Sequence, residues 1–251
     1  MAIIIAVANQ KGGVAKTTST INIGHALNEL GKKVLLIDLD PQASLTIGMG
    51  IEPDDLQKTL YNVLCEKINI KEIIIDINGI ALAPSTIDLS VAELNLSGEM
   101  SRENVLKRSL KKIEKDFDYI LIDCPPSLGL LTINALSSCK HVIIPTTTEY
   151  LAFRGVRCLV ETIQKVQDYI NSDIELFGIL PTMHDNRTIH SREVLEQFEN
   201  DYKETYILDY IKRSIKVSDS MLASKAVLNT APKHEISEAY RNVARKIIEN
   251  I

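Results

Sequence analysis

The sequence predicts a three-layer α/β fold built around a mainly parallel sheet. Two apolar runs, Ala2–Ala8 and Val34–Ile37, have the continuous hydrophobic character of strands buried on both faces. The first run is followed by a glycine-rich turn and then by a segment of helical periodicity, with an apolar stripe from Ile21 to Leu30. Strands and helices that alternate in this way are typical of a parallel sheet covered by helices on both faces.

The composition is that of an ordinary globular protein. The chain has 251 residues, of which 45% are hydrophobic and 24% are charged, and a chain of this size can bury roughly 70–75% of its unfolded surface. We expect one domain over residues 1–251, because no linker, repeat or low-complexity tract interrupts the pattern. The net charge is −5, so any contact with nucleic acid has to come from a local patch.

No targeting or membrane signal is apparent in the sequence. Met1 leads directly into the first predicted strand, and no apolar run approaches the roughly 20 residues that span a bilayer. The four cysteines are scattered without a C-x-x-C pair, which fits a reducing compartment and argues against zinc or iron–sulfur ligation. We therefore expect a cytoplasmic protein, with Cys124 as a small buried residue and His184 as a loop histidine without a metal.

The turn after the first strand has the composition of a phosphate-binding loop. Its sequence is Asn9-Gln10-Lys11-Gly12-Gly13-Val14-Ala15-Lys16-Thr17-Thr18. Backbone N–H groups in such a loop form a concave anion site, to which the following helix adds about half a positive charge. Lys16 would reach the β- and γ-phosphates, and the Thr17 hydroxyl would ligate Mg²⁺. The alternative is an ordinary turn whose glycines only permit positive φ, but Lys-Thr-Thr at the helix start favours a nucleotide site.

The loop departs from the standard pattern G-x-x-x-x-G-K-[ST]. Gln10 and Ala15 stand where the two glycines are usual, and Lys11 is an additional lysine before the glycine pair. If position 15 requires a left-handed backbone, the alanine side chain costs roughly 1–2 kcal/mol. We expect the fold to tolerate this cost.

Acidic residues follow two of the predicted strands. Asp38 and Asp40 come at the end of the strand that starts at Val34, and Asp123 ends the apolar run that starts at Tyr119. Ligand groups collect at the carboxyl ends of parallel strands, so these carboxylates should face the nucleotide. We expect Asp38 and Asp40 to order a magnesium-bound water and orient the attacking water, and Asp123 to hold Mg²⁺ through water. Helix capping is the alternative role for the first two.

Three segments together resemble the ParA/MinD family of deviant Walker A ATPases, and the Soj-type ParA proteins in particular. They are K-G-G-V-A-K-T-T at 11–18, D-L-D-P-Q at 38–42 and D-C-P-P-S-L-G-L-L-T-I-N-A-L at 123–136. The resemblance implies a P-loop NTPase fold, ATP and Mg²⁺ as cofactors, and a catalytic role for Asp40 in hydrolysis. It also implies an ATP-bound homodimer in which Lys11 contacts the nucleotide of the partner subunit.

The resemblance implies further contacts in the C-terminal part, where the similarity is looser. The loop 182–188 would lie near the adenine. The nucleotide-binding candidates are thus Lys11, Gly12, Gly13, Val14, Ala15, Lys16, Thr17, Thr18, Met183 and Asp185, and the DNA-contact candidates are Arg187, Arg213, Lys216 and Lys225. Binding to double-stranded DNA would be non-specific and dimer-dependent, and weak intrinsic hydrolysis would be stimulated by a ParB-type centromere-binding partner. Such a protein is nucleoid-associated. Taken alone, segment 210–219 is only a charged loop.

Two cation-bearing helices leave alternatives open. We expect residues 101–116 to form one helix whose cations are a solvated face or, alternatively, a DNA surface. The final helix, 235–251, mixes acids and bases on its polar face and has no Trp or Phe, so we expect it to dock on the sheet and not on a membrane. A MinD-like membrane ATPase and a metabolic P-loop phosphotransferase are the alternative functions.

The remaining elements are predicted from shorter patterns. Short helices at 54–67 and 86–96 should flank a strand at Ile80–Ala83. Strands are also expected at His141–Pro145 and Glu175–Pro181, and helices at 156–170 and 192–198. Arg154 stands where the family usually has an acidic residue, so no family role is transferred to it.

Overall fold

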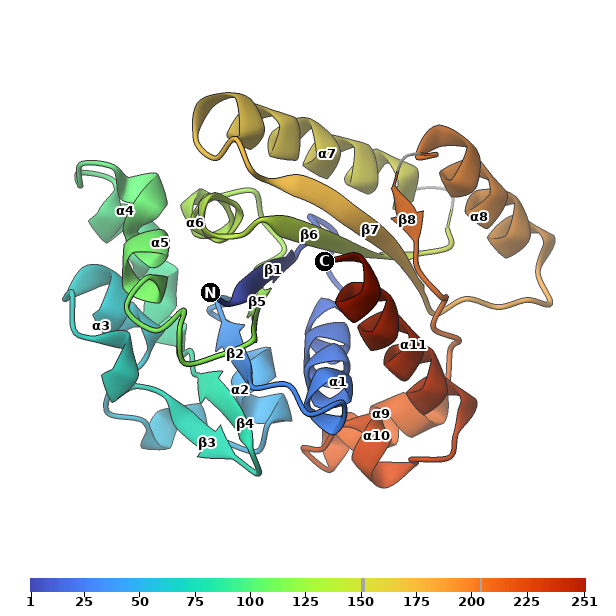
Figure 1. The fold of residues 1–251 in the computed structure, drawn as a ribbon, viewed down its shortest axis with the longest axis horizontal. Coiled ribbons are helices and arrows are strands. Elements are labelled where there is room, and N and C mark those ends of the chain that lie inside the picture. Colours follow the sequence, from blue (N-terminus) through green and yellow to red (C-terminus); the bar gives the residue numbers. More distant parts are fainter. Residues whose placement is uncertain (150–151, 204) are drawn as a thin grey trace.

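A mainly parallel sheet lies at the centre of the computed structural model, which describes residues 1–149, 152–203 and 205–251 (Figure 1). The described strands are β1 (Ile3–Val7), β2 (Val34–Asp38), β3 (Ile75–Ile77), β4 (Ile80–Ala83), β5 (Tyr119–Asp123), β6 (His141–Thr147), β7 (Glu175–Thr182) and β8 (Tyr206–Ile207). They form one sheet in the order β3-β4-β2-β5-β1-β6-β7-β8. Only the pairing of β3 with β4 is antiparallel among these strands. Because β1 lies between β5 and β6, the turn that follows it starts at the middle of the sheet.

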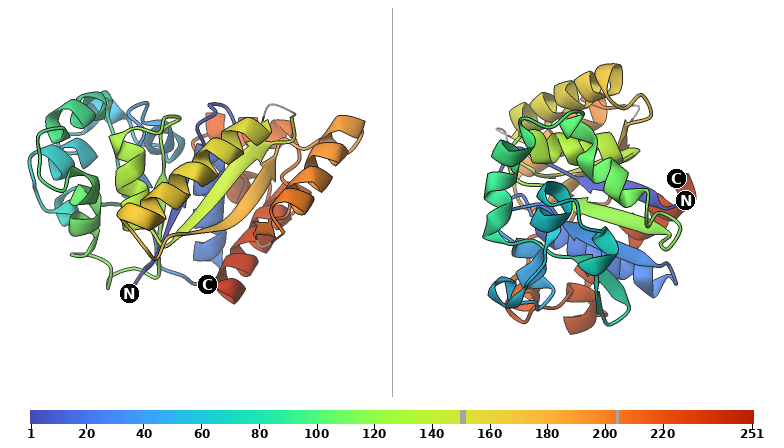
Figure 2. Two further views of the ribbon diagram at one scale, coloured as in Figure 1. Left: turned by 90° about the horizontal axis from the view of Figure 1, so that it is seen from above. Right: turned by 90° about the vertical axis from the view of Figure 1, so that its left-hand side faces the viewer.

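Helices cover both faces of the sheet, as the further views in Figure 2 show. The described α-helices are α1 (Lys16–Glu29), α2 (Ser44–Gly48), α3 (Leu60–Cys65), α4 (Ala92–Leu96), α5 (Val105–Leu110), α6 (Leu130–Ser138), α7 (Ala152–Tyr169), α8 (Ile189–Asp201), α9 (Ile215–Leu222), α10 (Val227–Thr230) and α11 (Glu235–Asn250). The buried residues of α3 to α8 belong to one hydrophobic cluster, and those of α1, α2, α10 and α11 belong to another. The predicted three-layer α/β fold is therefore confirmed.

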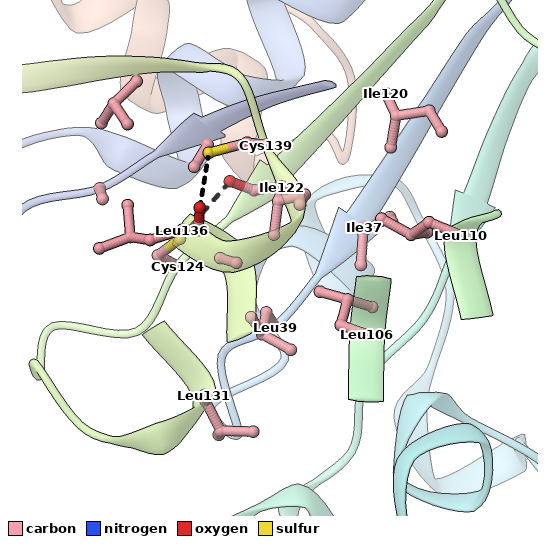
Figure 3. Close-up of a cluster of buried hydrophobic side chains, with 14 of the residues drawn as sticks. Ile37, Leu39, Leu106, Leu110, Ile120, Ile122, Cys124, Leu131, Leu136 and Cys139 are labelled. Carbon is pink, nitrogen blue, oxygen red and sulfur yellow. Dashed lines mark hydrogen bonds between the residues drawn. The ribbon is translucent and has the colours of Figure 1, made fainter. Parts of the chain in front are cut away.

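The first cluster contains the alternate side chains of β2 and β5. Ile37 lies beside Leu106 of α5 and Ile122 lies near Leu136 of α6 in this layer, and all four are fully buried (Figure 3). Cys124 lies in the same cluster with no exposed surface, and burial raises the pKa of its thiol well above the usual range. It is the small buried residue that the sequence predicts.

The second cluster joins the first and last helices of the described chain. A Cβ added to Gly24 would lie 2.6 Å from Leu36 Cδ2, so this glycine lets α1 approach β2 closely. The apolar stripe of α11 is buried against α1 and the sheet, with Tyr240, Val243 and Ile247 all fully buried. The expectation that the final helix docks within the fold is confirmed.

Several predicted boundaries are wrong. Residues 101–116 do not form one helix: after a 3₁₀ turn, α5 ends at Leu110, and the chain goes on in irregular turns. There Ile113 N bonds to Leu110 O at 2.9 Å, an i→i−3 contact that interrupts the α-helical ladder while Ile113 stays buried. The short strands β3 and β8 were not predicted, and α7 and α8 begin three to four residues earlier than the sequence indicated.

Candidate active site

The loop between β1 and α1 has the backbone of a phosphate cradle. Gly13 has φ of 70°, and Ala15 has φ of 62° and ψ of 34°, so both residues are left-handed. A Cβ added to Gly12 or Gly13 would meet no atom within 4 Å, which leaves the concave side of the loop open. Successive N–H groups in such a conformation converge on an anion. Position 15 therefore does have the left-handed backbone that the sequence left open, with the strain that the alanine side chain brings.

Neighbouring side chains hold this loop in place. The buried Asn9 side chain donates to Pro145 O of β6 at 2.7 Å and accepts from the backbone N–H of Lys11 at 3.0 Å. At the other end, the Thr182 hydroxyl donates to Val14 O at 3.0 Å. Neither Asn9 nor Thr182 was singled out in the sequence, although an asparagine two residues before the turn residue is a common signal for such a bond.

Lys16, Thr17 and Asp123 meet at the carboxyl edge of the sheet. The Thr17 hydroxyl donates to Asp123 Oδ2 at 2.6 Å, and Asp123 has no exposed surface. Burial raises the pKa of Asp123 well above its usual range, and burial lowers that of Lys16, whose ammonium donates to Lys11 O at 3.2 Å. A buried carboxylate next to a threonine hydroxyl is a site at which added positive charge would be stabilising.

Asp38 lies beside Asp123, because the two are register partners in β2 and β5. Asp38 is fully buried, and burial raises its pKa to about 7. Its Oδ2 accepts from both the N–H and the hydroxyl of Thr46 at 2.8 and 2.7 Å, and its Oδ1 accepts from Asp40 N at 3.2 Å. Asp38 thus binds the first turn of α2, as the capping alternative predicts, and it also lies within the carboxylate cluster. Asp40 is less buried and accepts from Gln42 N at 2.9 Å.

Lys11 points away from the loop toward the end of β6. Its ammonium forms an ion pair with Glu149 Oε2 at 2.6 Å, and the two side chains are 39% and 65% exposed. The hydrogen bond from Lys11 lowers the pKa of Glu149. Glu149 was not predicted to take part, and no spacing in the sequence links positions 11 and 149.

A cavity of about 690 Å³ opens beside the loop. Its lining includes Gly13 and Ala15 of the loop, Met183 after β7, and Val217 and Met221 of α9. The apolar side chains and the position next to the phosphate cradle suit a nucleoside base. Of the two predicted contacts near the base, Met183 lines this cavity and Asp185 does not. The apolar residues of α9 were not predicted.

The four DNA-contact candidates lie on two neighbouring segments. They are Arg187 in the loop before α8, and Arg213, Lys216 and Lys225 in and around α9. The guanidinium of Arg187 pairs with Asp185 at 2.7 Å. Arg213, Lys216 and Lys225 are exposed, and a β-bridge between His184 and Lys212 joins the two segments.

The residues present fit ATP and Mg²⁺. The loop offers backbone N–H groups and Lys16 to phosphates, and Thr17 with Asp123 offers a hydroxyl and a carboxylate to a hard cation. Within the described ranges there is no group of three His, Cys, Asp or Glu side chains arranged to hold a metal by itself. Mg²⁺ keeps several waters and is bound by few protein groups together with substrate phosphates, and the Thr17 hydroxyl with Asp123 offers groups of that kind. The bound ion would neutralise phosphate charge, while Asp40 could orient a water.

The fold and this site define a P-loop nucleotide hydrolase. A family model described as an AAA domain matches residues 2–176. The sporulation initiation inhibitor protein Soj of Bacillus subtilis is 39% identical over 249 residues, covering 98% of both chains. An uncharacterized protein of Mycobacterium tuberculosis is 43% identical over 249 residues, covering 98% of this chain and 78% of the relative. The chain belongs to the ParA/Soj family of P-loop ATPases.

A solved structure agrees with the cofactors. A crystal structure of cobyrinic acid a,c-diamide synthase from Mycobacterium smegmatis with bound ADP and magnesium has a TM-score of 0.88 and 42% identity. The match covers 99% of this chain and 95% of that chain. The protein is an ATPase that uses ATP and Mg²⁺. No helix in the described parts of the chain has the length and apolar character needed to cross a membrane.

Proposed function

We propose that the protein is a DNA-partition ATPase that switches between DNA-bound and free states with its nucleotide. The observation that carries the proposal is the position of α9, which borders the nucleotide cavity with Val217 and Met221 and bears the exposed Lys216. The Soj and ParA names of its relatives support the same role. ATP binding would form a homodimer, with Lys11 leaving Glu149 to contact the partner subunit's nucleotide.

The net charge of −5 makes DNA binding depend on few cations. The candidates Arg187, Arg213, Lys216 and Lys225 double in a homodimer. Neutralising roughly six phosphates loses on the order of a thousandfold in affinity between 50 and 200 mM salt. Binding is therefore expected to be non-specific and salt-sensitive, which suits nucleoid association. A ParB-type centromere-binding partner would stimulate the slow hydrolysis and release the DNA.

The test is binding to duplex DNA of unrelated sequence at two salt concentrations, with ATP and with ADP. Lys16→Ala should abolish ATP-dependent binding, and Arg213→Ala should weaken it at every sequence. Lys112→Ala is the matched control, because this exposed cation belongs to the other basic segment. Binding that fails in Lys112→Ala but not in Arg213→Ala would move the DNA surface to that segment. No binding by the wild-type protein with either nucleotide would refute the partition role.

A second candidate is favoured by the name of the Mycobacterium smegmatis synthase. A metabolic enzyme of this class would need an acceptor pocket beside the γ-phosphate. ATP turnover that is accelerated by cobyrinic acid with an ammonia source, and not by DNA with a ParB-type partner, would support it. A membrane-binding role is disfavoured, because the apolar face of α11 is already buried within the fold.

A further inference from the structure

Helix α9 has one side that lines the cavity and another that is exposed to solvent. One side faces the nucleotide cavity through Val217 and Met221, and the side chain of Lys216 is exposed on the same helix. Lys225 follows the helix closely and is also exposed. Figure 1 places α9 next to α10, beside the pair formed by α1 and α11. Any shift of α9 along this cavity therefore moves cations at the surface.

The cavity side of α9 also lies against α2, the short helix that follows β2. A Cβ added to Gly48, the last residue of α2, would lie 2.8 Å from Met221 Cε and 2.7 Å from Ile21 Cδ1. There is no room for a methyl group between Gly48 of α2 and the end of the Met221 side chain. Gly50 lies near the residues after α9 as well, since a Cβ added there would lie 3.6 Å from Ser224 Cβ. Met221 thus joins the nucleotide cavity to α2.

Helix α2 is in turn fixed to the catalytic carboxylates. Asp38 Oδ2 accepts both bonds from Thr46, at 2.8 and 2.7 Å, and Ala43 N bonds to Asp40 O at 2.9 Å. Asp38, Asp40 and α2 therefore form one hydrogen-bonded unit. A displacement of Asp38 or Asp40 would therefore move Gly48, because Gly48 ends the five-residue helix α2 that these aspartates hold.

We propose that Met221 is a positioning residue that couples this unit to two of the DNA-contact candidates, Lys216 in α9 and Lys225 just after it. The proposal rests on the proposed function, since it explains how nucleotide state sets DNA affinity. Met221 receives the change from two directions, directly from a base in the cavity and indirectly from α2 through Gly48. Lys216 and Lys225 then adopt the spacing that follows the phosphates only in the ATP state.

The experiment measures the ratio of DNA dissociation constants with ADP and with ATP, at saturating nucleotide. Allosteric couplings are typically about 5–150-fold, so Met221→Ala should lower the ratio by about fivefold or more. Met221→Leu should keep most of it, because the volume is conserved. Ile215→Ala is the matched control: it truncates an apolar side chain of the same helix that is 77% exposed and outside the cavity, and it should keep the wild-type ratio.

Dimerisation is measured in parallel by sedimentation with ATP, so that a weaker dimer is not mistaken for lost coupling. Gly48→Ala provides an independent variant, because the added methyl group pushes on Met221 from the α2 side and should also change the ratio. In the wild-type protein, amide hydrogen exchange of residues 215–222 should differ between the ADP and ATP states.

A wild-type ratio in both Met221→Ala and Gly48→Ala, together with unchanged exchange of α9, would overturn the coupling and leave the partition role intact. Absence of DNA binding by the wild-type protein would overturn both. An altered ratio in Ile215→Ala equal to that in Met221→Ala would also overturn the assignment, because it would show a general effect of truncating α9.

Discussion

Replacing Ala15 with glycine should stabilise the protein. Ala15 is left-handed, with φ of 62° and ψ of 34°, and this conformation costs an L-residue roughly 1–2 kcal/mol. Glycine removes that strain but increases the freedom of the unfolded chain, which offsets about 0.4–1 kcal/mol. The net effect is a stabilisation of about 0–1.6 kcal/mol, centred on about 0.8 kcal/mol, which corresponds to a rise in Tm of ~2–3 °C for a chain of this size.

The assay is thermal unfolding by calorimetry, with two control substitutions. Ala239→Gly, in the middle of α11, should instead destabilise by about 0.5–1 kcal/mol. Ala43→Gly tests the second left-handed alanine, with φ of 53°, but this residue is only 3% exposed, so its methyl group is buried. Loss of that buried group, worth about 0.8 kcal/mol, should cancel most of the gain.

The affinity for ADP shows whether the strain at Ala15 is present in the free protein or arises when nucleotide binds. We expect residue 15 to have the same backbone in the free and the bound protein, so the dissociation constant of ADP should change by less than about threefold. A lower Tm for Ala15→Gly would refute the strain argument. Tightening of ADP binding by tenfold would show instead that the strain arises on binding.

Three other predictions concern stability and the ion pair at the loop. Burial lowers the pKa of His25 to about 4, so the unfolded state binds a proton at a higher pH than the folded state does. The free energy of unfolding should therefore fall by up to about 1.4 kcal/mol per pH unit as the pH decreases from 6.5 toward 4. His25→Gln should flatten this dependence in urea titrations. Tyr240→Phe should lower the free energy of unfolding by less than about 1 kcal/mol, because the contact of the Tyr240 hydroxyl with Ser19 is long at 3.5 Å. Tyr240→Ala should lower it by about 3–5 kcal/mol. Equal losses for the two variants in urea unfolding would contradict this. Glu149→Gln should change Tm by no more than ~2 °C, because such an exposed ion pair contributes about 0–1 kcal/mol. It should also strengthen ATP-dependent dimerisation, because Lys11 no longer has to leave Glu149. A weaker dimer in sedimentation would argue instead that Glu149 holds Lys11 in the position that the dimer needs.

The centre of the sheet was predictable because its strands are buried on both faces. The apolar runs before Asp38 and Asp123 need no partner to be recognised, and their order places both carboxylates at one edge. The loop pattern raised a left-handed backbone at Ala15 as a condition, and the structure has it. These features depend on local sequence and on general rules for parallel sheets.

The remaining features depend on tertiary contacts that leave no periodic signal. The short strand β3 exists because it pairs with β4 across a tight turn, and β8 has only two residues. The helix predicted over 101–116 ends at Leu110, and the i→i−3 bond from Ile113 N to Leu110 O continues the chain in tight turns although the apolar spacing would also suit a longer helix. The partnership of Lys11 with Glu149 joins residues 138 positions apart, so only the folded chain brings them together.

The pairing of α1 with α11 has a consequence for synthesis on the ribosome. Arg241 binds Glu29 at 2.7 Å, across 212 positions of sequence, and β1 pairs with strands that lie more than 100 residues later. Contacts this distant form slowly, and partly made chains expose the surfaces that wait for them. Helix α1 leaves the ribosome long before α11, so the part of its surface that packs against α11 is covered only when residues 235–250 emerge. The nascent protein should therefore gain its ability to bind ATP late, and should depend on chaperones until then.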